Sequence, residues 1–359
     1  MSSKIRIPKL YKTLGNRIND NIEELKIRIF DRIFEKLPRL KKKYTNKQKH
    51  KSYQDIKYHL DYLVQAIRYS KPTLFNEYIR WVKSILLSRN ISLKSLVITF
   101  EMIREVLNEN FPKESDLINS YLDNAIAIIQ TPDETDFSYI KESNPLKELA
   151  LTYLEYVLAG KKYEANDLIL KAVSDGIEIK EIYLNVFQPV QQEIGRLWEE
   201  NKISVAQEHY CTAVTQLIIS RLYNNIFATK RIGKTLIATC IGGELHELGI
   251  RMVADFFEME GWETYYLGAN TPIESIIKSI IHNNADLLAV SATMMIHIPI
   301  VEDMIQQIKK TNAKDVKILV GGYPFNIVPD LWKYIGADGF SPDADTAVKT
   351  ANKMLESSG

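Results

Sequence analysis

The sequence has few cysteines and no long apolar run. Only two of its 359 residues are cysteine, Cys211 and Cys240, and both lie inside apolar patterns rather than in the spaced pairs that bind metal ions. We therefore expect reduced, buried thiols. No apolar run reaches the ~20 residues that span a bilayer, and the N-terminus is polar and basic without the apolar core of a signal peptide. These absences predict a cytoplasmic protein with no membrane span.

The sequence also lacks a dinucleotide-binding motif and a DNA-binding motif. No GxGxxG spacing follows the first predicted strand, residues 235–241, which argues against a dinucleotide site. The first 130 residues show no helix-turn-helix signature. Residues 1–57 nevertheless carry 17 Lys and Arg against 6 Asp and Glu, a net charge of about +11, although the whole chain carries only +1. A solvated helical face is the favoured interpretation, and nucleic acid, an anionic membrane and an acidic partner stay open as alternatives.

The length and the composition, 45% apolar and 25% charged, predict a globular protein of two or three domains. We predict an N-terminal helical domain over 1–131, a four-helix bundle over 146–230 and an α/β domain over 233–357. Apolar residues three and four apart from Ile18 to Leu37 predict a helix that ends near Pro38, followed by a linker over 41–52. Further helices are predicted in this domain over 53–70, 72–89, 92–110 and 114–131.

A polar, acidic segment over 131–145 ends in Pro145 and predicts a domain boundary. Four helices joined by short loops follow, and Ser204 is a predicted N-cap for the last of them. These helices are predicted over 146–159, 161–175, 179–200 and 204–228.

From Lys234 the pattern alternates between strand and helix. The strands are apolar on both faces, as in residues 287–290 and 318–320, which indicates a parallel sheet covered by helices on both sides. This is the pattern of a flavodoxin-like, Rossmann-type five-stranded domain, which binds ligands at the carboxyl ends of its strands. The strands are predicted over 235–241, 263–267, 286–292, 316–320 and 338–340. The helices are predicted over 246–260, 272–283, 299–312, 327–335 and 343–356.

Three of these strand ends carry polar or small residues. His246 lies where the first strand gives way to a helix, and Glu244 two residues earlier can accept the proton of one ring nitrogen, which makes the other nitrogen a better metal ligand. Ser291 and Thr293 end the third strand, and Gly321 with Gly322 ends the fourth. Hydroxyl groups can bind a ligand here, and glycines let it approach the backbone.

In their spacing these residues resemble the cobalamin-binding signature DxHxxG…SxL/T…GG, with Glu244 where many members have Asp. The resemblance implies that His246 is the lower axial ligand of cobalt and Glu244 its hydrogen-bond partner. It also implies that the detached nucleotide tail of the cofactor lies along the strand ends. The further cofactor-binding residues that it implies are Leu245, Glu247, Leu248, Gly249, Ser291, Thr293, Gly321, Gly322 and Tyr323.

The preceding bundle is similar to that of CarH-like adenosylcobalamin-dependent photoreceptors, because Trp198 precedes Glu208-His209 in the pattern W-x9-EH. That resemblance implies that Trp198 shields the adenosyl group, Glu208 hydrogen-bonds it and His209 lines the cap. Glu199 departs from the family, whose best-known members have a histidine there. No DNA-binding helix-turn-helix precedes the bundle either.

The resulting hypothesis is a light-responsive signalling protein without catalytic residues, in which light breaks the cobalt–carbon bond and rearranges the bundle. Its output would be a protein contact through residues 1–131 or a light-dependent homo-oligomer, with DNA binding a minority alternative. The alternative function is a corrinoid methyl carrier of a methyltransferase system. A mutase is disfavoured because the chain contains no substrate barrel.

The remaining histidines, His50, His59, His282 and His297, are interpreted as non-functional residues without partners. His297 follows the third strand closely enough to touch a ligand.

Overall fold

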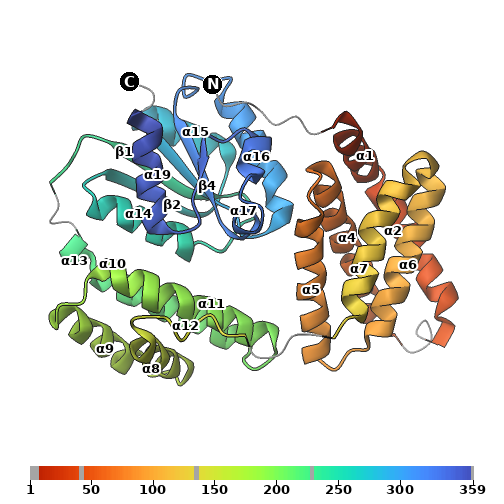
Figure 1. The fold of residues 1–359 in the computed structure, drawn as a ribbon, viewed down its shortest axis with the longest axis horizontal. Coiled ribbons are helices and arrows are strands. Elements are labelled where there is room, and N and C mark those ends of the chain that lie inside the picture. Colours follow the sequence, from red (N-terminus) through yellow and green to blue (C-terminus); the bar gives the residue numbers. More distant parts are fainter. Residues whose placement is uncertain (1–7, 40–43, 133–136, 227–229, 357–359) are drawn as a thin grey trace. The chain divides into compact units, whose positions relative to one another are not determined.

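The computed structural model describes residues 8–39, 44–132, 137–226 and 230–356. The chain forms two compact units, residues 5–133 and residues 134–359. In Figure 1 the first unit is coloured red to yellow and is helical, and the second passes from a green helical bundle to a blue α/β domain. Within the described ranges, no helix combines the length and the apolar character needed to cross a membrane.

The first unit consists of amphipathic helices whose apolar faces pack together. The helix expected up to Pro38 is two helices, because the chain breaks at Asn21. The predicted linker over 41–52 is wrong from Asn46 onward, because the Thr45 side chain and Gln48 form a reciprocal capping box that starts a helix there; Lys41, Lys42 and Lys43 lie outside the described residues. The helices are α1 (Lys9–Asp20), α2 (Ile22–Lys36), α4 (Asn46–Arg68), α5 (Pro72–Ser88), α6 (Leu93–Asn110), η1 (Pro112–Glu114) and α7 (Ser115–Gln130).

Basic residues of the first two helices pair with acidic residues of the same unit. Arg28 and Arg32 of α2 both contact Glu109 of α6, at 2.7 and 2.8 Å, and Arg17 of α1 contacts Glu114 at 2.6 Å. Part of the positive charge of residues 1–57 is therefore neutralised within this unit.

The bundle of the second unit follows the predicted helices with two interruptions, a π-helical turn in the helix predicted over 179–200 and a break at Leu222 that divides the helix predicted over 204–228 into two. Ser204 caps its helix as predicted, in a second capping box with Gln207. The helix predicted over 179–200 contains one π-helical turn, η2, where the backbone widens. The elements are α8 (Lys147–Leu158), α9 (Lys162–Ser174), α10 (Ile179–Ile182), η2 (Tyr183–Phe187), α11 (Gln188–Glu199), α12 (Val205–Arg221) and α13 (Tyr223–Ile226). Residues 227 and 228 of the last predicted helix lie outside the described residues.

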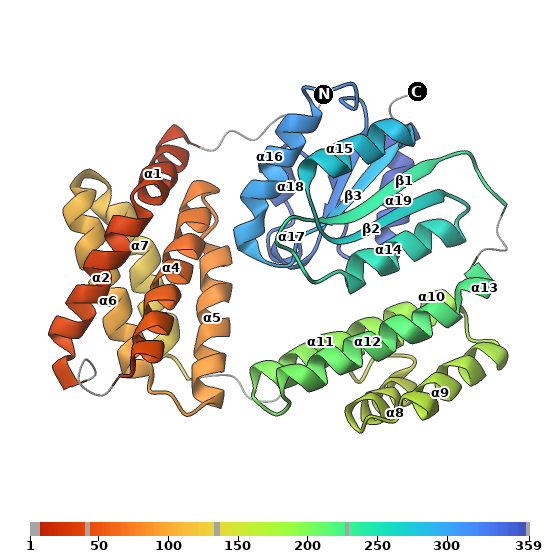
Figure 2. The same cartoon turned by 180° about the vertical axis from the view of Figure 1, so that it is seen from behind.

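The α/β part has the predicted flavodoxin-like topology. Its five parallel strands lie in the order β2-β1-β3-β4-β5; Figure 2 shows β1, β2 and β3 of this sheet beside α14 and α15. The strands are β1 (Thr235–Ile241), β2 (Glu263–Thr271), β3 (Leu287–Ser291), β4 (Lys317–Gly321) and β5 (Gly339–Phe340). The helices are α14 (Leu248–Met259), α15 (Ile273–His282), η3 (Met295–His297), α16 (Ile298–Ile308), α17 (Tyr323–Ile327), α18 (Leu331–Ile335) and α19 (Ala344–Glu356).

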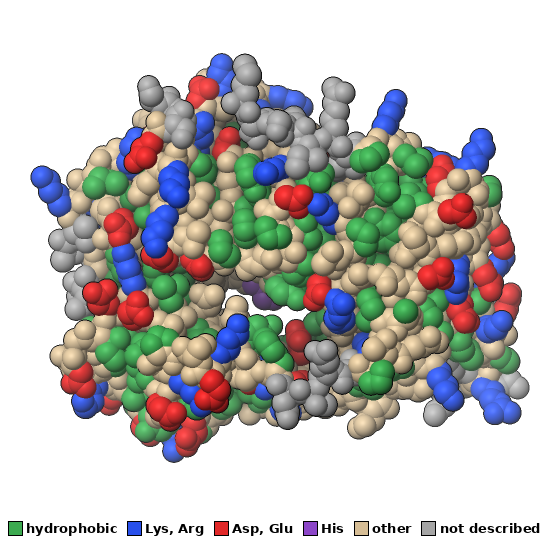
Figure 3. Space-filling view, in the orientation of Figure 1, with side chains coloured by type: hydrophobic (Ala, Val, Ile, Leu, Met, Phe, Trp, Pro, Cys, Tyr) green, Lys and Arg blue, Asp and Glu red, His purple; other side chains and the backbone are tan. Residues whose placement is uncertain are grey.

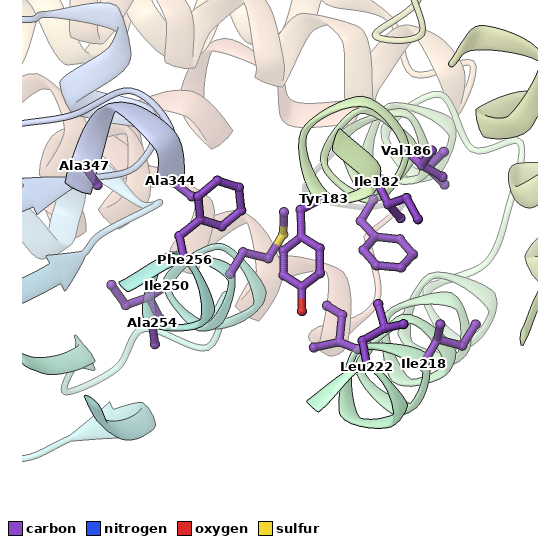
Figure 4. Close-up of a cluster of buried hydrophobic side chains, with 14 of the residues drawn as sticks. Ile182, Tyr183, Val186, Ile218, Leu222, Ile250, Ala254, Phe256, Ala344 and Ala347 are labelled. Carbon is purple, nitrogen blue, oxygen red and sulfur yellow. The ribbon is translucent and has the colours of Figure 1, made fainter. Parts of the chain in front are cut away.

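One hydrophobic core joins the bundle to the sheet. Helices α14 and α19 cover one face of the sheet, and Phe256 of α14 lies beside Tyr183 of the bundle, whereas Ile250 points to the other side of α14 (Figure 4). The rings of Tyr183 and Phe256 lie 5.9 Å apart. Because this core is continuous, the division of residues 134–359 into a bundle and a sheet domain stays a prediction. Cys211 and Cys240 are both buried in this core and free.

At the centre of this interface lies the carboxylate of Asp255, on α14. The hydroxyls of Tyr183 and Tyr223 each donate to it at 2.8 Å. Asp255 is only 2% exposed, so these two tyrosines supply hydrogen bonds that water cannot readily supply. The pair of tyrosines thereby ties the bundle to α14.

Candidate functional site

The strand register places the loops that follow β1, β3 and β4 at one edge of the sheet. Cys240 of β1 pairs with Ser291 of β3, and Ser291 pairs with Gly321 of β4. The residues that follow these positions leave the sheet side by side, as the sequence predicts.

Glu244 is the buried centre of this edge. Its side chain is fully buried, and both of its carboxylate oxygens accept hydrogen bonds. Oε1 accepts from the backbone N–H of His246 at 3.0 Å and from its Nδ1 at 2.5 Å. Oε2 accepts from the N–H groups of Thr293 and Met294, at 2.7 and 3.1 Å, and from Nδ1 of His297 at 2.9 Å. One carboxylate therefore joins the β1–α14 loop to the β3–α16 loop.

These hydrogen bonds favour the charged form of Glu244. Burial alone raises the pKa of a carboxyl group, but the donors from His246, His297 and the backbone of Thr293 outweigh it and hold the pKa of Glu244 well below its usual range. The hydrogen bond to Glu244 raises the pKa of His246 in spite of partial burial, and the charges of Glu244 and Glu208 raise it further.

The imidazole of His246 is held on one side and open on the other. Its side chain is 61% exposed, although its partner Glu244 is buried. In the neutral ring, Nδ1–H donates to Glu244, so the lone pair belongs to Nε2. This arrangement presents a fixed, basic nitrogen at the sheet edge, which suits metal ligation.

His297 is the site residue that the sequence reasoning missed. The interpretation of His297 as partnerless is wrong, because the loop after β3 folds back and places it on Glu244. The same interpretation is wrong for His59, whose Nδ1 lies 2.8 Å from the Tyr78 hydroxyl and whose pKa burial lowers to about 4. The sequence offered one signal for His297, which is its position six residues after Ser291, in the loop that follows the third strand.

The loop after β1 is braced from β2. Asn270 accepts from the N–H of Gly243 at 2.8 Å through its side chain and donates its own N–H to the Glu244 carbonyl at 2.9 Å. Glu247 accepts from the Tyr266 hydroxyl and the Ala269 N–H of β2, both at 2.9 Å. The other oxygen of Glu247 accepts from Gln216 of α12 at 3.1 Å, so this residue also links the loop to the bundle.

The small residues after β4 allow close backbone packing. Gly322 has φ +104°, and a Cβ there would lie 2.2 Å from the carbonyl oxygen of Ala292. Gly321, Ser291 and Thr293 are half-buried at the same edge, whereas Tyr323 is exposed at the start of α17. The Ser341 hydroxyl, just after β5, is buried and has no hydrogen-bond partner among the described residues.

The remaining predicted residues surround His246 in sequence or lie on the bundle. Leu245 is 71% exposed beside His246, while Leu248 is half-buried and Gly249 exposed in the first turn of α14. Trp198, at the end of α11, is half-buried. Glu208 and His209 pair with each other, with 2.5 Å between Oε2 and Nδ1.

One face of α12 points at the sheet domain. Gln216 and Ser220 on this face contact Glu247 and Arg251 of the α14 region. Two turns earlier the same face carries Glu208, in keeping with the effect of its charge on His246. In Figure 3 the surface between the bundle, below, and the sheet domain, above, is hollowed, and a histidine side chain is visible inside the hollow.

Comparisons with known proteins match both parts of the second unit. A model described as a B12 binding domain matches residues 234–350, and another of the same description matches residues 149–223. Dimethylamine corrinoid protein 3 of Methanosarcina mazei is 30% identical over 130 residues, which cover 36% of this chain and 75% of that protein. Dimethylamine corrinoid protein 1 of the same organism is 25% identical over 217 residues, which cover 58% of this chain and 97% of that protein.

A solved structure shows the same fold. The Methanosarcina barkeri monomethylamine corrinoid protein superposes with a TM-score of 0.52 at 19% identity, over 58% of this chain and 99% of that chain. This likeness supports the helical bundle followed by a five-stranded parallel sheet.

These relatives correct one expectation and support another. The photoreceptor interpretation is wrong, because the relatives that this chain resembles are named dimethylamine corrinoid proteins, one of them matched over 217 residues. The W-x9-EH pattern misled because three residues on a shared fold do not determine which function that fold carries. The cobalamin resemblance agrees with both matching models, and the cofactor is a cobalt corrinoid. The chain belongs to the family of B12-binding corrinoid proteins.

Proposed function

We propose that this chain is the corrinoid-binding methyl carrier of a methyltransferase system. The observation that carries the proposal is the match of bundle and sheet together to dimethylamine corrinoid proteins, over nearly the whole length of one of them. The exposed imidazole of His246, backed by a buried carboxylate, supplies the ligand that such a cofactor requires. In this function the corrinoid carries a methyl group on cobalt, and an adenosyl group is not required.

The residues present fit a cobalt corrinoid. Nε2 of His246 would bind the cobalt, while Glu244 fixes the ring and keeps the proton on Nδ1. Leu245, which is largely exposed beside His246, would offer an apolar contact to the bound corrinoid. The bound corrinoid supplies a cobalt centre that accepts and releases a methyl group.

The strand ends receive the nucleotide tail. Ser291 and Thr293 offer hydroxyls, and the absence of side chains at Gly321 and Gly322 lets the tail reach the backbone. Ser341 has a buried hydroxyl for which the described part of the chain offers no hydrogen-bond partner, and a Cβ added to Gly321 would lie 3.2 Å from the Ser341 carbonyl oxygen. This unpaired hydroxyl is the group here that a polar ligand would satisfy.

The bundle would cover the bound cofactor from the side of α12, and the partner would be a methyltransferase. Glu208 and His209, on the face of α12 that points at the sheet domain, would face the cofactor together with Trp198. A methyl carrier must present this side to its partner, so α12 has to leave room for approach. Residues 5–133 are a second candidate surface for the partner.

The test is methyl transfer together with cofactor preference. The full chain is titrated with methylcobalamin and with adenosylcobalamin, and the dissociation constants are read from the visible spectrum. Protein loaded with methylcobalamin carrying a 13C-methyl group is then incubated with host extract and a thiol acceptor, and transfer is followed by NMR. Free methylcobalamin at the same concentration is the control.

A carrier binds methylcobalamin at least as tightly as adenosylcobalamin and transfers the label faster than the free cofactor. Rejection of methylcobalamin, or transfer no faster than from the free cofactor, refutes the proposal.

A further inference from the structure

The first helical unit has no counterpart in dimethylamine corrinoid protein 1 of Methanosarcina mazei. The match covers 97% of that protein, so the part left over is far too short to correspond to residues 5–133. The regions that match B12 binding domains, 149–223 and 234–350, lie in the second unit. This chain therefore joins an additional helical unit to a complete corrinoid-binding unit.

Residues 137–144, here named the strap, lead from the first unit into the bundle and are fastened to α11. The Glu193 carboxylate is only 5% exposed, and its Oε2 accepts from the Ser138 hydroxyl at 3.3 Å and from the Tyr139 N–H at 3.1 Å. Ile140 is also 5% exposed and belongs to the core that joins the bundle to the sheet. One buried carboxylate and one apolar side chain thus hold the first half of the strap.

The end of the strap is fastened to the π-helical turn η2. Nδ2 of Asn144 donates to the Asn185 carbonyl at 2.7 Å, and Oδ1 of Asn144 accepts from the Leu146 N–H at 2.8 Å, at the start of α8. The helical partner of the Asn185 carbonyl, four residues on, is Pro189, which has no N–H. Asn144 therefore supplies the hydrogen bond that the proline removes from this turn.

The first attachment lies close to the residue of α11 that would face the corrinoid. Glu193 also accepts from Nε of Arg196 at 3.0 Å, and Arg196 pairs with Glu200 at the C-cap of the helix. Trp198 lies between Arg196 and Glu200 in the last turn of α11. The carboxylate that binds the strap therefore also fixes the turn that carries Trp198.

The second attachment lies on the turn that contacts the sheet domain. Tyr183 begins η2, and its hydroxyl donates to Asp255 of α14 at 2.8 Å. Helix α14 starts two residues after His246. The position of η2 therefore affects the helix that follows the proposed cobalt ligand.

We propose that docking of the strap on η2 and α11 strengthens corrinoid binding, so that an event in the first unit that loosens the strap weakens it. The inference rests on the proposed site, through Trp198 and His246, and not on methyl transfer. A docked strap holds both elements in place, whereas a released strap gives them freedom that the bound corrinoid has to remove again. Coupling of this kind is reciprocal and typically about 5- to 150-fold, so the corrinoid stabilises the docked strap by the same factor.

Two substitutions release the strap, and a third is the matched control. Asn144→Asp keeps the oxygen that accepts from the Leu146 N–H but replaces the donor to Asn185 with a second acceptor. Ile140→Asp places a charge at the core position that anchors the strap. Phe137→Asp introduces the same charge at a side chain that is 56% exposed, so docking stays intact.

The full chain of each variant is titrated with hydroxocobalamin, and the dissociation constant is read from the visible spectrum. N144D and I140D are expected to bind at least about fivefold more weakly than wild type, and F137D is expected to bind as tightly as wild type. In wild type, hydrogen exchange measured by NMR is expected to show that hydroxocobalamin slows exchange of the Tyr139 and Ile140 N–H groups at least about fivefold.

Dissociation constants of N144D and I140D equal to that of wild type overturn the inference while the corrinoid site and the carrier function stand. Exchange in the strap that hydroxocobalamin leaves unchanged has the same meaning. An F137D variant that binds as weakly as N144D also overturns it, because added charge rather than docking then explains the loss. If circular dichroism shows that I140D is unfolded, N144D decides, since it removes no apolar contact. A wild-type chain that binds no hydroxocobalamin refutes the proposed function together with the strap.

Discussion

At the scale of single residues, the sheet edge depends on one buried charge and one glycine. Glu244 keeps its charge in the interior because donors surround both of its oxygens. Gly322 keeps a backbone conformation and a spacing that exclude any side chain. Both residues can be tested in the apoprotein, before any cofactor is added.

Substituting Glu244→Gln is expected to lower the free energy of unfolding by about 2–4 kcal/mol. The amide nitrogen would face N–H donors where an oxygen now accepts from them, and the charge that strengthens the remaining bonds would be gone. Urea unfolding of the apoprotein measures the difference, and E274Q, at an exposed glutamate on α15, is the matched control. Equal stability of E244Q and E274Q would contradict this account of the edge.

Substituting Gly322→Ala is expected to destabilise the second unit by at least about 2 kcal/mol, because the methyl group would meet the Ala292 carbonyl oxygen and φ is +104°. Gly195→Ala is the matched control: this position lies in α11, and an added Cβ meets nothing within 4 Å. There, helix propensity predicts a gain of up to about 1 kcal/mol. Thermal melts show whether each substitution raises or lowers the melting temperature. A G322A variant as stable as wild type would refute the close approach of Gly322 to the Ala292 carbonyl.

At the scale of elements, helix α14 connects the site to the bundle. It begins two residues after His246 and carries Asp255 to the two tyrosines of the bundle. A second element, α11, ends at Trp198 and Glu199 and is held by the buried carboxylate of Glu193. The first attachment joins the bundle to the sheet domain, and the second joins α11 to residues 138 and 139.

Removing the hydroxyl in Tyr183→Phe is expected to lower the free energy of unfolding by about 1–2 kcal/mol, because Asp255 loses one of its two tyrosine donors in a buried place. Tyr223→Phe should have a smaller effect, since Tyr223 is only half-buried and water can replace its hydroxyl. Urea unfolding of the two variants provides the measurement. A larger effect for Y223F than for Y183F would be inconsistent with this burial argument.

Acid should weaken the attachment of α11. Burial raises the pKa of Glu193, but hydrogen bonds from Arg196, from the Tyr139 N–H and from the Ser138 hydroxyl outweigh it, and the net pKa lies below its usual value. A depressed folded-state pKa contributes stability above the unfolded pKa, and this contribution is lost as pH falls through the folded pKa.

The stability difference between wild type and Glu193→Gln should therefore be largest near neutral pH and shrink as pH falls from about 5 to about 3. Urea unfolding across this range gives the difference at each pH. A pH-independent difference would show that the charge of Glu193 does not contribute.

At the scale of the whole molecule, the chain has two compact units. Residues 134–359 contain both regions that match B12 binding domains and one continuous core, while residues 5–133 form a separate helical unit. A ligand that binds only the folded form of one unit stabilises that unit.

Heating the full chain is thus expected to give two transitions, of which cobalamin shifts one. Hydroxocobalamin at 100 times its dissociation constant should add about 2.7 kcal/mol to the unit that binds it. Calorimetry with and without the cofactor gives both transitions, and H246A should show a smaller shift. An equal shift of both transitions would mean that the two units unfold together.

Much of the fold and part of the site follow from local sequence patterns. Apolar periodicity and strand-ending glycines predict nearly every helix and strand of residues 146–356 because these signals act between near neighbours. The placement of His246 and Glu244 after β1 follows from the same signals, and so does the alignment of Ser291 and Gly321. The π-turn at 183–187 escaped prediction because widening one helical turn leaves the apolar pattern unchanged.

The sequence by itself determined the alternation of elements, the parallel sheet and the residues at its carboxyl edge. Only the tertiary structure decided which of those residues touch: His297 with Glu244, Gln216 with Glu247, and two tyrosines with Asp255. Local patterns specify which face of an element is buried. Pairings between polar side chains far apart in the chain follow from strand order and loop path, which exist only once the core has packed.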